Sequence, residues 1–335
     1  MASFRFASPR SRPAVFGVLA VFSSVCCVLV LLSSHEDILE ASVFPLSVDY
    51  YGAAVSLLYQ RGFDVSPRTC QVGKRRVEVL VVVYSTCRDI AARNSVRRTW
   101  KAHSRPGDVS VVFLVGRSSN LSCTHGLRAE SRTHGDLIVS RNFDSGAKLT
   151  LKSVAMVEWV SDHCPRVRRV VRTDHDVLLN VPRLLEVVRS TRGDRRTVYG
   201  HLLRGTRPVR TPGDECWVPR SEYPADRYPD HVLGRAYMFT GDLARLQFSA
   251  ALKMRFFRME EVFFTGFLAE RLGARLAHVD GFFAALDDVG RVNASDDREW
   301  AFDPCDLRRR VAVQHGGQDA MYQLWRVFND RSRNC

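Results

Sequence analysis

The 335-residue sequence is as informative in what it lacks as in what it contains. It has no internal repeat and no low-complexity tract, and its hydrophobic fraction of 45% is that of a globular protein rather than a disordered one. No C-x-x-C pair occurs among its nine cysteines, which argues against a zinc site. It also lacks a dense basic block. The formal net charge is +13, but the arginines are scattered, which argues against nucleic-acid binding.

Charge is absent from one long stretch, residues 13–32, which is apolar and long enough to cross a bilayer as a helix. The charges around it differ in sign, with Arg5, Arg10 and Arg12 before it and Glu36, Asp37 and Glu40 after it. The positive-inside rule then places the N-terminus in the cytosol and the remainder across the membrane. A cleaved signal peptide is the alternative, although its hydrophobic region is usually shorter. We therefore expect a cytosolic tail (1–12), a transmembrane signal-anchor (13–32), a lumenal stem (33–75) and a single folded domain (76–335).

Seven cysteines would lie on the translocated side: Cys70, Cys87, Cys123, Cys164, Cys216, Cys305 and Cys335. An oxidising lumen allows disulfides, and the odd number leaves at least one thiol over, for which Cys335 is the candidate. The sequence does not determine the pairing. Two glycosylation sequons, at Asn120 and Asn293, agree with this topology.

From residue 77 onward, apolar strands alternate with helical patterns. Continuous apolar runs at 77–84, 109–115 and 167–171 are typical of strands buried on both faces, and 136–139 is a shorter strand. Residues 149–160 have helical spacing. This alternation predicts an α/β fold around a central, mostly parallel sheet. After residue 190 the pattern changes: residues 205–228 resemble an ordered loop, and 233–240 a compact strand.

Two pairs of acidic residues are candidates for chemistry. Asp174 and Asp176 follow the apolar run 167–171, and in an open α/β sheet ligands bind at this end of a strand. Two carboxylates there suit Mg²⁺ or Mn²⁺ holding a diphosphate, although a solvated turn would look the same. Glu260 and Glu261 precede an aromatic run at an expected helix start. They could supply a base or simply favour the helix N-terminus electrostatically.

Several motifs together resemble one family. In chain order they lie at residues 93–100, 113–116, 130–138, 142–145, 149–152, 173–180, 228–237 and 260–266. Their order and spacing over residues 77–330 resemble the β-1,3-galactosyltransferase and β-1,3-N-acetylglucosaminyltransferase family of Golgi enzymes (glycosyltransferase family 31). The sequence departs from the family pattern at a few positions: His175 within the acidic motif, Glu261 in place of Asp, and Gly146, Lys101 and Arg235. These departures bear on acceptor preference more than on the fold.

The resemblance implies a GT-A-like nucleotide-sugar-binding fold, a UDP-sugar donor, Mn²⁺, inversion at the anomeric carbon and a type II protein of the Golgi membrane with a lumenal catalytic domain. It implies Asp174, Asp176 and His315 as metal ligands, and Glu261 as the base, with Glu260 as the alternative. Residues expected to bind the donor are Ser85, Arg93, Arg97, Asp144, Lys152, Arg172 and Asp174.

On this basis we expect transfer of galactose from UDP-galactose in β-1,3 linkage to a glycan on a protein or lipid. UDP-N-acetylglucosamine is the alternative donor, because the two sugars differ in details that spacing does not reveal. A homologue that binds a sugar nucleotide or glycan without catalysis also remains open, as does a basic scaffold on a membrane surface. A phosphatase of the haloacid-dehalogenase type is less consistent, because its acidic loop usually opens the domain.

Overall fold

The computed structural model describes residues 52–70, 77–104, 108–285 and 303–332. The expected tail (1–12) and membrane segment (13–32) lie outside these residues, as do Asn293 and Cys335. Within the described ranges, no helix is both long enough and apolar enough to cross a membrane.

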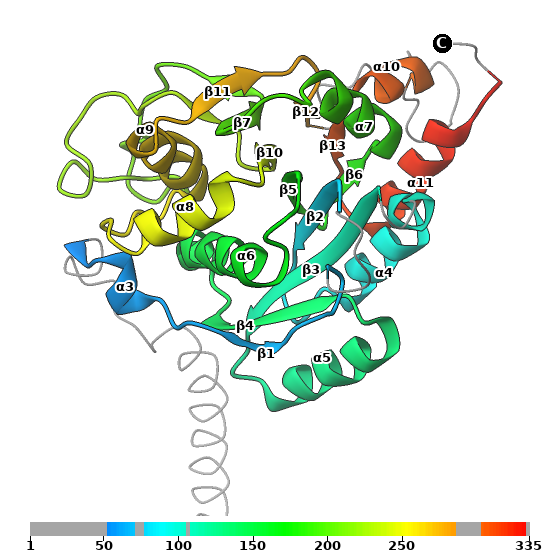
Figure 1. The fold of residues 1–335 in the computed structure, drawn as a ribbon, viewed down its shortest axis with the longest axis horizontal. Coiled ribbons are helices and arrows are strands. Elements are labelled where there is room, and N and C mark those ends of the chain that lie inside the picture. The colour runs from blue at the N-terminus through cyan, green and yellow to red at the C-terminus, as the bar shows by residue number, and fades with distance from the viewer. Residues whose placement is uncertain (1–51, 71–76, 105–107, 286–302, 333–335) are drawn as a thin grey trace, which may run out of the picture. The chain divides into compact units, whose positions relative to one another are not determined.

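An eight-stranded sheet forms the centre of the fold, with the strand order β1-β4-β3-β2-β5-β10-β7-β11 (Figure 1). Its strands are β1 (Phe63–Val65), β2 (Val79–Tyr84), β3 (Val109–Arg117), β4 (Leu137–Phe143), β5 (Arg169–Asp174), β7 (Thr197–Gly200), β10 (Ala236–Thr240) and β11 (Arg275–His278). The pairings show that β1 and β10 run opposite to the other strands. The expectation of an α/β fold around a mostly parallel sheet is therefore confirmed.

Two small sheets and a set of helices complete the fold. The small sheets join β12 (Phe283–Ala284), β13 (Ala312–Gln314) and β6 (Val177–Leu179) in one, and β8 (Leu202–Leu203) with β9 (His231–Val232) in the other. The helices are α3 (Val55–Leu58), α4 (Ile90–Arg98), α5 (Leu121–His134), α6 (Leu149–His163), α7 (Val181–Ser190), α8 (Leu243–Ala251), α9 (Leu268–Arg271), α10 (Pro304–Arg309) and α11 (Gln318–Asn329). Short 3₁₀ segments lie at Trp100–His103 and Gly146–Lys148, and a π-helix spans Val262–Phe267.

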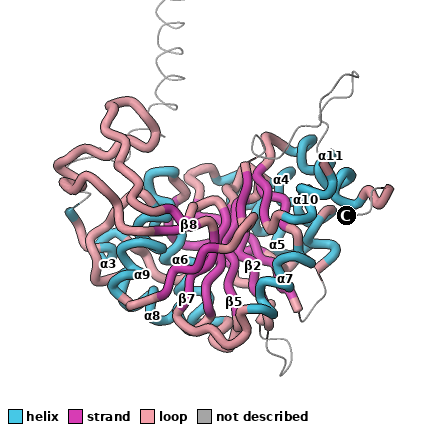
Figure 2. Tube along the Cα trace, turned by 90° about the horizontal axis from the view of Figure 1, so that it is seen from above, coloured by secondary structure: helices cyan, strands magenta, loops and turns pink. Residues whose placement is uncertain are grey.

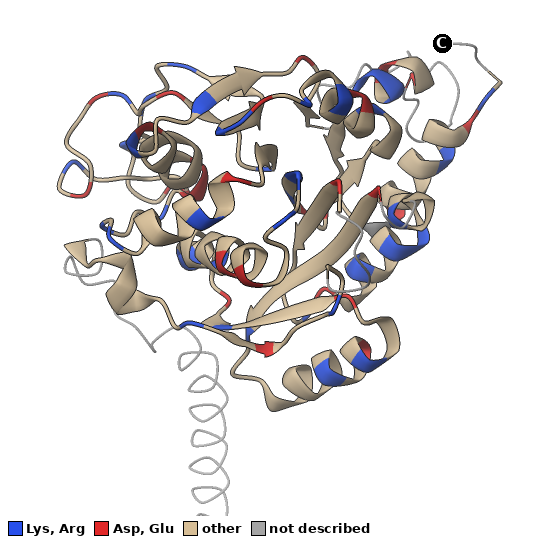
Figure 3. Cartoon of the chain, in the orientation of Figure 1, with Lys and Arg blue, Asp and Glu red and all other residues tan. Residues whose placement is uncertain are grey.

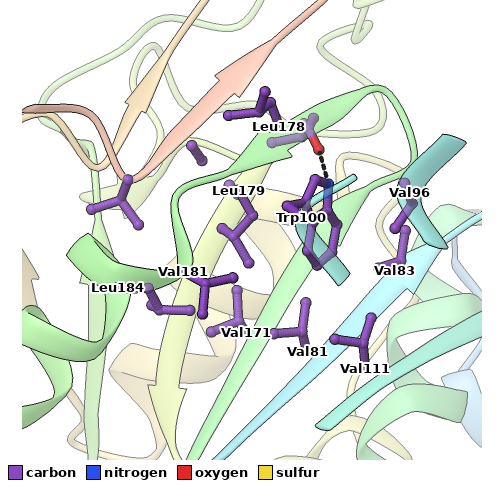
Figure 4. Close-up of a cluster of buried hydrophobic side chains, with 14 of the residues drawn as sticks. Val81, Val83, Val96, Trp100, Val111, Val171, Leu178, Leu179, Val181 and Leu184 are labelled. Atoms are coloured by element: carbon purple, nitrogen blue, oxygen red, sulfur yellow. Dashed lines mark hydrogen bonds between the residues drawn. The ribbon is translucent and has the colours of Figure 1, made fainter. Parts of the chain in front are cut away.

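Helices cover both faces of the sheet, with α6 and α8 on one side and α4, α5, α7 and α11 on the other (Figure 2). Strand β2 is buried throughout because it lies between these layers. Its odd-numbered valines pack in the core beneath α4 and α7, where the indole of Trp100 donates to the Val177 carbonyl at 3.1 Å (Figure 4). The Tyr84 hydroxyl points the other way and hydrogen-bonds Ser153 of α6 at 2.7 Å. The period of two along a strand therefore divides its side chains between two cores.

Residues 52–70, which lie in the expected stem, belong to the folded unit. Strand β1 pairs with β4. A disulfide joins Cys70 to Cys164 at the end of α6. The Tyr59 hydroxyl donates to the buried Glu158 carboxylate at 2.5 Å. These contacts of residues expected in the stem are long-range, so they leave no local period in the sequence.

The fold shows part of the disulfide pairing that the sequence left open. A second disulfide joins Cys87, before α4, to Cys123 in α5. Among the described cysteines, Cys216 is a free thiol and is exposed. Basic and acidic side chains are distributed over many helices and loops rather than gathered on one element (Figure 3).

Candidate functional site

The carboxyl ends of β2 and β5 mark the centre of the candidate site. The two strands are parallel neighbours, and Tyr84 at the end of β2 lies beside Asp174 at the end of β5. Strand order reverses between them, since β3 and β4 lie beyond β2 while β5 follows β4 in sequence. Such a switch point is where open α/β sheets bind ligands. Asp174 therefore lies at the end of a strand next to the switch point, as the sequence predicted.

Asp176 lies beside the C-terminal segment of the chain. Strand β13 pairs antiparallel with β6, and this pairing brings His315 N–H to 2.8 Å from the Asp176 carbonyl. The Gln314 amide donates to Asp176 Oδ2 at 2.8 Å. Within the described chain, the buried Asp176 Oδ1 and the buried His315 Nε2 have no hydrogen-bond partner. Asp176 Oδ1 offers a lone pair directly. His315 Nδ1 accepts from the Gly317 amide at 3.3 Å, so the neutral ring carries its proton on Nε2 and must change tautomer before Nε2 can bind a metal. A buried polar atom without a partner is costly unless something binds it.

Burial lowers the pKa of His315, although the neighbouring Asp176 charge acts in the opposite direction. The lowered pKa keeps the imidazole neutral, which is the form that coordinates metals. The described residues contain no cluster of three or more His, Cys, Asp and Glu arranged to hold a metal ion. The protein groups at this position are therefore an acidic pair with one neutral histidine at its edge.

Two arginines contact the acidic pair from different environments. Arg172 is 1% exposed, and its Nη1 lies 3.2 Å from Asp174 Oδ1 while it also donates to the Gly234 carbonyl. Its guanidinium lies 4.4 Å from the centre of the Tyr84 ring. Arg235 has a half-exposed side chain, with Nη1 3.4 Å from Asp174 Oδ2 and 3.9 Å from Asp176 Oδ2. The site thus has one fixed and one solvent-facing positive charge.

A buried lysine connects the ends of β2 and β4. Lys152 of α6 donates to the Ser85 carbonyl and to Asp144 Oδ1, each at 2.6 Å. The other oxygen of Asp144 accepts from the Gly116 amide at 2.8 Å. A Cβ on Gly116 would lie 2.5 Å from Asp144 Oδ1, so only glycine fits there. The expected donor-binding residues Ser85, Asp144 and Lys152 are thereby brought together.

Arg93 and Arg97 were expected to bind the sugar-nucleotide donor, but their side chains are held by carboxylates. Arg93 donates to both oxygens of Glu130, at 2.8 and 2.7 Å, and to the Ser85 hydroxyl at 2.8 Å. Arg97 Nη2 lies 2.7 Å from both Glu130 Oε1 and Asp136 Oδ1. Burial alone would raise the pKa of Glu130, but hydrogen bonds and charge from the two arginines lower it. The guanidinium of Arg97, a residue expected to bind the donor, is therefore already occupied by these acidic residues.

The adjacent glutamates have different surroundings. Glu260 is 1% exposed, and its Oε1 accepts from the Ser153 and Tyr237 hydroxyls at 2.6 and 2.7 Å. Burial raises the pKa of Glu260, although the charge of Arg172 opposes this. Glu261 is partly exposed and packs against Gly234, where an added Cβ would meet its carboxylate at 3.1 Å. In the described chain, no hydrogen bond or ion pair engages the Glu261 carboxylate, which leaves it able to accept a proton from a ligand.

Sequence reasoning missed two contributors to the site. Gln314 was overlooked because nothing local marks a glutamine as a partner of a carboxylate far away in the chain. Arg235 was noted only as a departure from a motif. Its contact with the acidic pair follows from the antiparallel pairing of β10 with β5, in which Ala236 faces Thr173.

The chain is similar in sequence to several known proteins. A sequence profile described as Galactosyltransferase matches residues 91–280. Human β-1,3-galactosyltransferase 5 is 31% identical over 263 residues, covering 77% of this chain and 80% of that protein. Mouse β-1,3-galactosyltransferase 1 is 27% identical over 273 residues, covering 79% and 77%. Among solved structures, the WbbM bifunctional glycosyltransferase in its apo form has a TM-score of 0.40 at 14% identity, covering 80% of this chain and 51% of that one.

Proposed function

The chain belongs to the galactosyltransferase family and is a glycosyltransferase, and from this premise we propose that it transfers galactose from UDP-galactose to a glycan acceptor in β-1,3 linkage with inversion. Galactose is favoured over N-acetylglucosamine because the two relatives described above are named as β-1,3-galactosyltransferases. One structural observation carries the proposal: a carboxylate pair lies at the strand-end switch point, where a buried Asp176 oxygen and a buried His315 nitrogen have no partner among the described residues.

The donor set fits a divalent cation. Carboxylate oxygens and a neutral imidazole suit Mn²⁺, and an Arg235 nitrogen already lies within 4 Å of both carboxylates, which shows that the pair attracts positive charge. Asp174, Asp176 and His315 are the residues that would hold the ion. When bound, Mn²⁺ would offset the negative charge of the UDP leaving group.

Glu261 is the proposed general base. Inversion requires one group to take the proton of the acceptor hydroxyl while the hydroxyl oxygen attacks the anomeric carbon. The bond from this carbon to UDP breaks, and UDP leaves with the electron pair. Glu261 has a free carboxylate on a partly exposed surface, whereas Glu260 is enclosed by Ser153, Tyr237 and Arg172. Glu260 therefore positions Arg172, which in turn holds Asp174.

Lys152 and Arg172 would provide fixed positive charge near the diphosphate. Both are buried and already hydrogen-bonded, so they lose little conformational entropy when a ligand binds. Ser85 and Asp144, which share Lys152, would contact the nucleoside end of the donor. Arg93 would act indirectly, by fixing Ser85.

The cellular placement is part of the same proposal. Residues 13–32 would anchor the chain in the Golgi membrane, with the catalytic domain in the lumen, where the disulfides Cys70–Cys164 and Cys87–Cys123 are stable.

The test is UDP release by the full chain from UDP-galactose and UDP-N-acetylglucosamine, with Mn²⁺ and with β-galactoside or N-acetylhexosamine acceptors. Asp176→Ala should lower turnover at least about 10²-fold, because it removes charge stabilisation of the leaving group. The matched control is Asp226→Ala, which removes an exposed aspartate paired with Arg220. We expect UDP-galactose to be the better donor, and EDTA to abolish its turnover. Turnover that favours UDP-N-acetylglucosamine would refute the donor assignment, and no turnover of either donor would refute the enzyme assignment.

A further inference from the structure

Arg235 reaches the acidic pair because of strand register. It directly precedes β10, where Ala236 faces Thr173 across the antiparallel pairing with β5, so Arg235 comes opposite Asp174. Its Nη1 is 3.4 Å from Asp174 Oδ2 and 3.9 Å from Asp176 Oδ2. A single guanidinium nitrogen therefore lies within ion-pair distance of both carboxylates.

The two arginines at this site differ in their freedom to move. Arg172 is buried against Tyr84, and bonds to the Gly234 carbonyl as well as to Asp174. The Arg235 side chain is 53% exposed, and within the described residues its ion-pair partners are Asp174 and Asp176. Exposed ion pairs are weak and easily exchanged. The Arg235 side chain can therefore move away from Asp174 and Asp176, whereas the buried Arg172 side chain is held in place.

We propose that Arg235 is a built-in competitor of the metal: its guanidinium occupies the cation position between Asp174 and Asp176 in the free enzyme, and the donor's diphosphate draws it away so that a divalent ion can bind. This inference rests on the proposed function for the identity of donor and metal.

The charges explain the competition. With Arg235 in place, the carboxylates of Asp174 and Asp176 face two guanidinium groups, those of Arg172 and Arg235, so an added divalent ion meets like charge. A diphosphate offers Arg235 a stronger, bidentate partner. Metal binding should therefore be weak alone and stronger with UDP. By linkage, UDP binding should be strengthened by metal to the same degree.

The experiment measures Mn²⁺ binding rather than catalysis. The full chain is stripped of metal with EDTA, dialysed and titrated with Mn²⁺, with and without UDP, while free Mn²⁺ is followed by electron paramagnetic resonance. Binding lost in Asp176→Ala defines the site. The test variant is Arg235→Ala, and the matched control is Arg220→Ala, which removes an exposed arginine paired with Asp226. Thermal unfolding in EDTA checks that each variant is folded.

We expect Arg235→Ala to bind Mn²⁺ at least about fivefold more tightly than wild type without UDP. This is the factor for two unit charges about 4 Å apart in water, and is therefore a lower bound for a divalent ion. UDP should then strengthen Mn²⁺ binding less in this variant than in wild type. Arg220→Ala should match wild type in both respects, and Arg235→Lys, which keeps the charge, should lie between wild type and Arg235→Ala.

Equal Mn²⁺ affinity in wild type and Arg235→Ala would overturn the inference and leave the proposed transferase activity standing. Weaker binding in Arg235→Ala would show that Arg235 supports the metal, which also overturns it. Absence of Mn²⁺ binding from every variant overturns it as well, and the donor-turnover assay then decides separately whether the chain is a galactosyltransferase.

Discussion

Replacement of Gly116 by alanine should disturb both stability and donor binding. The added Cβ would lie 2.5 Å from Asp144 Oδ1 and 2.7 Å from the Asn142 carbonyl oxygen. The second contact is with the backbone, so a side-chain rotation cannot relieve it. Asp144 must move, and it then loses its bond to the Gly116 amide and its position against Lys152.

The expected cost can be built from these contacts. Overpacking a tight site costs about 1–3 kcal/mol. A lost hydrogen bond to a charged group costs about 1.5–3 kcal/mol more. We therefore expect the free energy of unfolding to fall by about 2.5–6 kcal/mol, a substantial part of the roughly 5–15 kcal/mol typical of a domain. The KM for the donor should rise, because Asp144 and Lys152 would no longer be held at the strand ends.

Urea unfolding followed by tryptophan fluorescence measures this change, provided that the m value is unchanged. Gly126 supplies the matched control. It lies in helix α5 with nothing within 4 Å of an added Cβ, so Gly126→Ala should stabilise the protein by about 0.5–1 kcal/mol. If Gly116→Ala changed the free energy of unfolding by less than about 0.5 kcal/mol, the range of a surface substitution, the close approach described here would be refuted.

Three further predictions follow from contacts elsewhere. Glu261→Gln should lower kcat by about 10²–10⁴-fold with little change in donor KM, whereas Glu260→Gln should mainly lower thermal stability; a kcat near wild type in Glu261→Gln would exclude it as the base. The pKa of Glu130 is lowered in the folded state, so its stabilising contribution is present above the unfolded pKa and lost as pH falls through the folded value. Unfolding at several pH values should show wild type and Glu130→Gln converging in acid, and a constant difference would contradict this. Replacing both Cys70 and Cys164 by serine should lower the free energy of unfolding by about 4–5 kcal/mol, because the disulfide closes a loop of 94 residues; unchanged urea stability would contradict it.

Local sequence patterns predicted those features that depend on residues close together in the chain. The valine run of β2 predicted a strand covered on both faces, and every residue of β2 is buried. Asn180 and Pro182 are typical of a helix start, and Asn180 caps α7 with Pro182 in its first turn. The position of Asp174 at the end of a strand was likewise predictable, because strand ends are marked by where the apolar run stops.

Tertiary structure decided which side chains meet at that strand end. Arg235 is 61 residues from Asp174, and Gln314 is 138 residues from Asp176. Only the registers of β10 on β5 and of β13 on β6 bring them together. Glu260 and Glu261 are neighbours in sequence, but only the folded chain shows that Glu260 is buried while Glu261 is partly exposed. Sequence determined the family, the strands formed by long apolar runs and the acidic motif, because these depend on local residue order. The fold decided the partners of each charge, because cross-strand register and packing join residues that no local pattern connects.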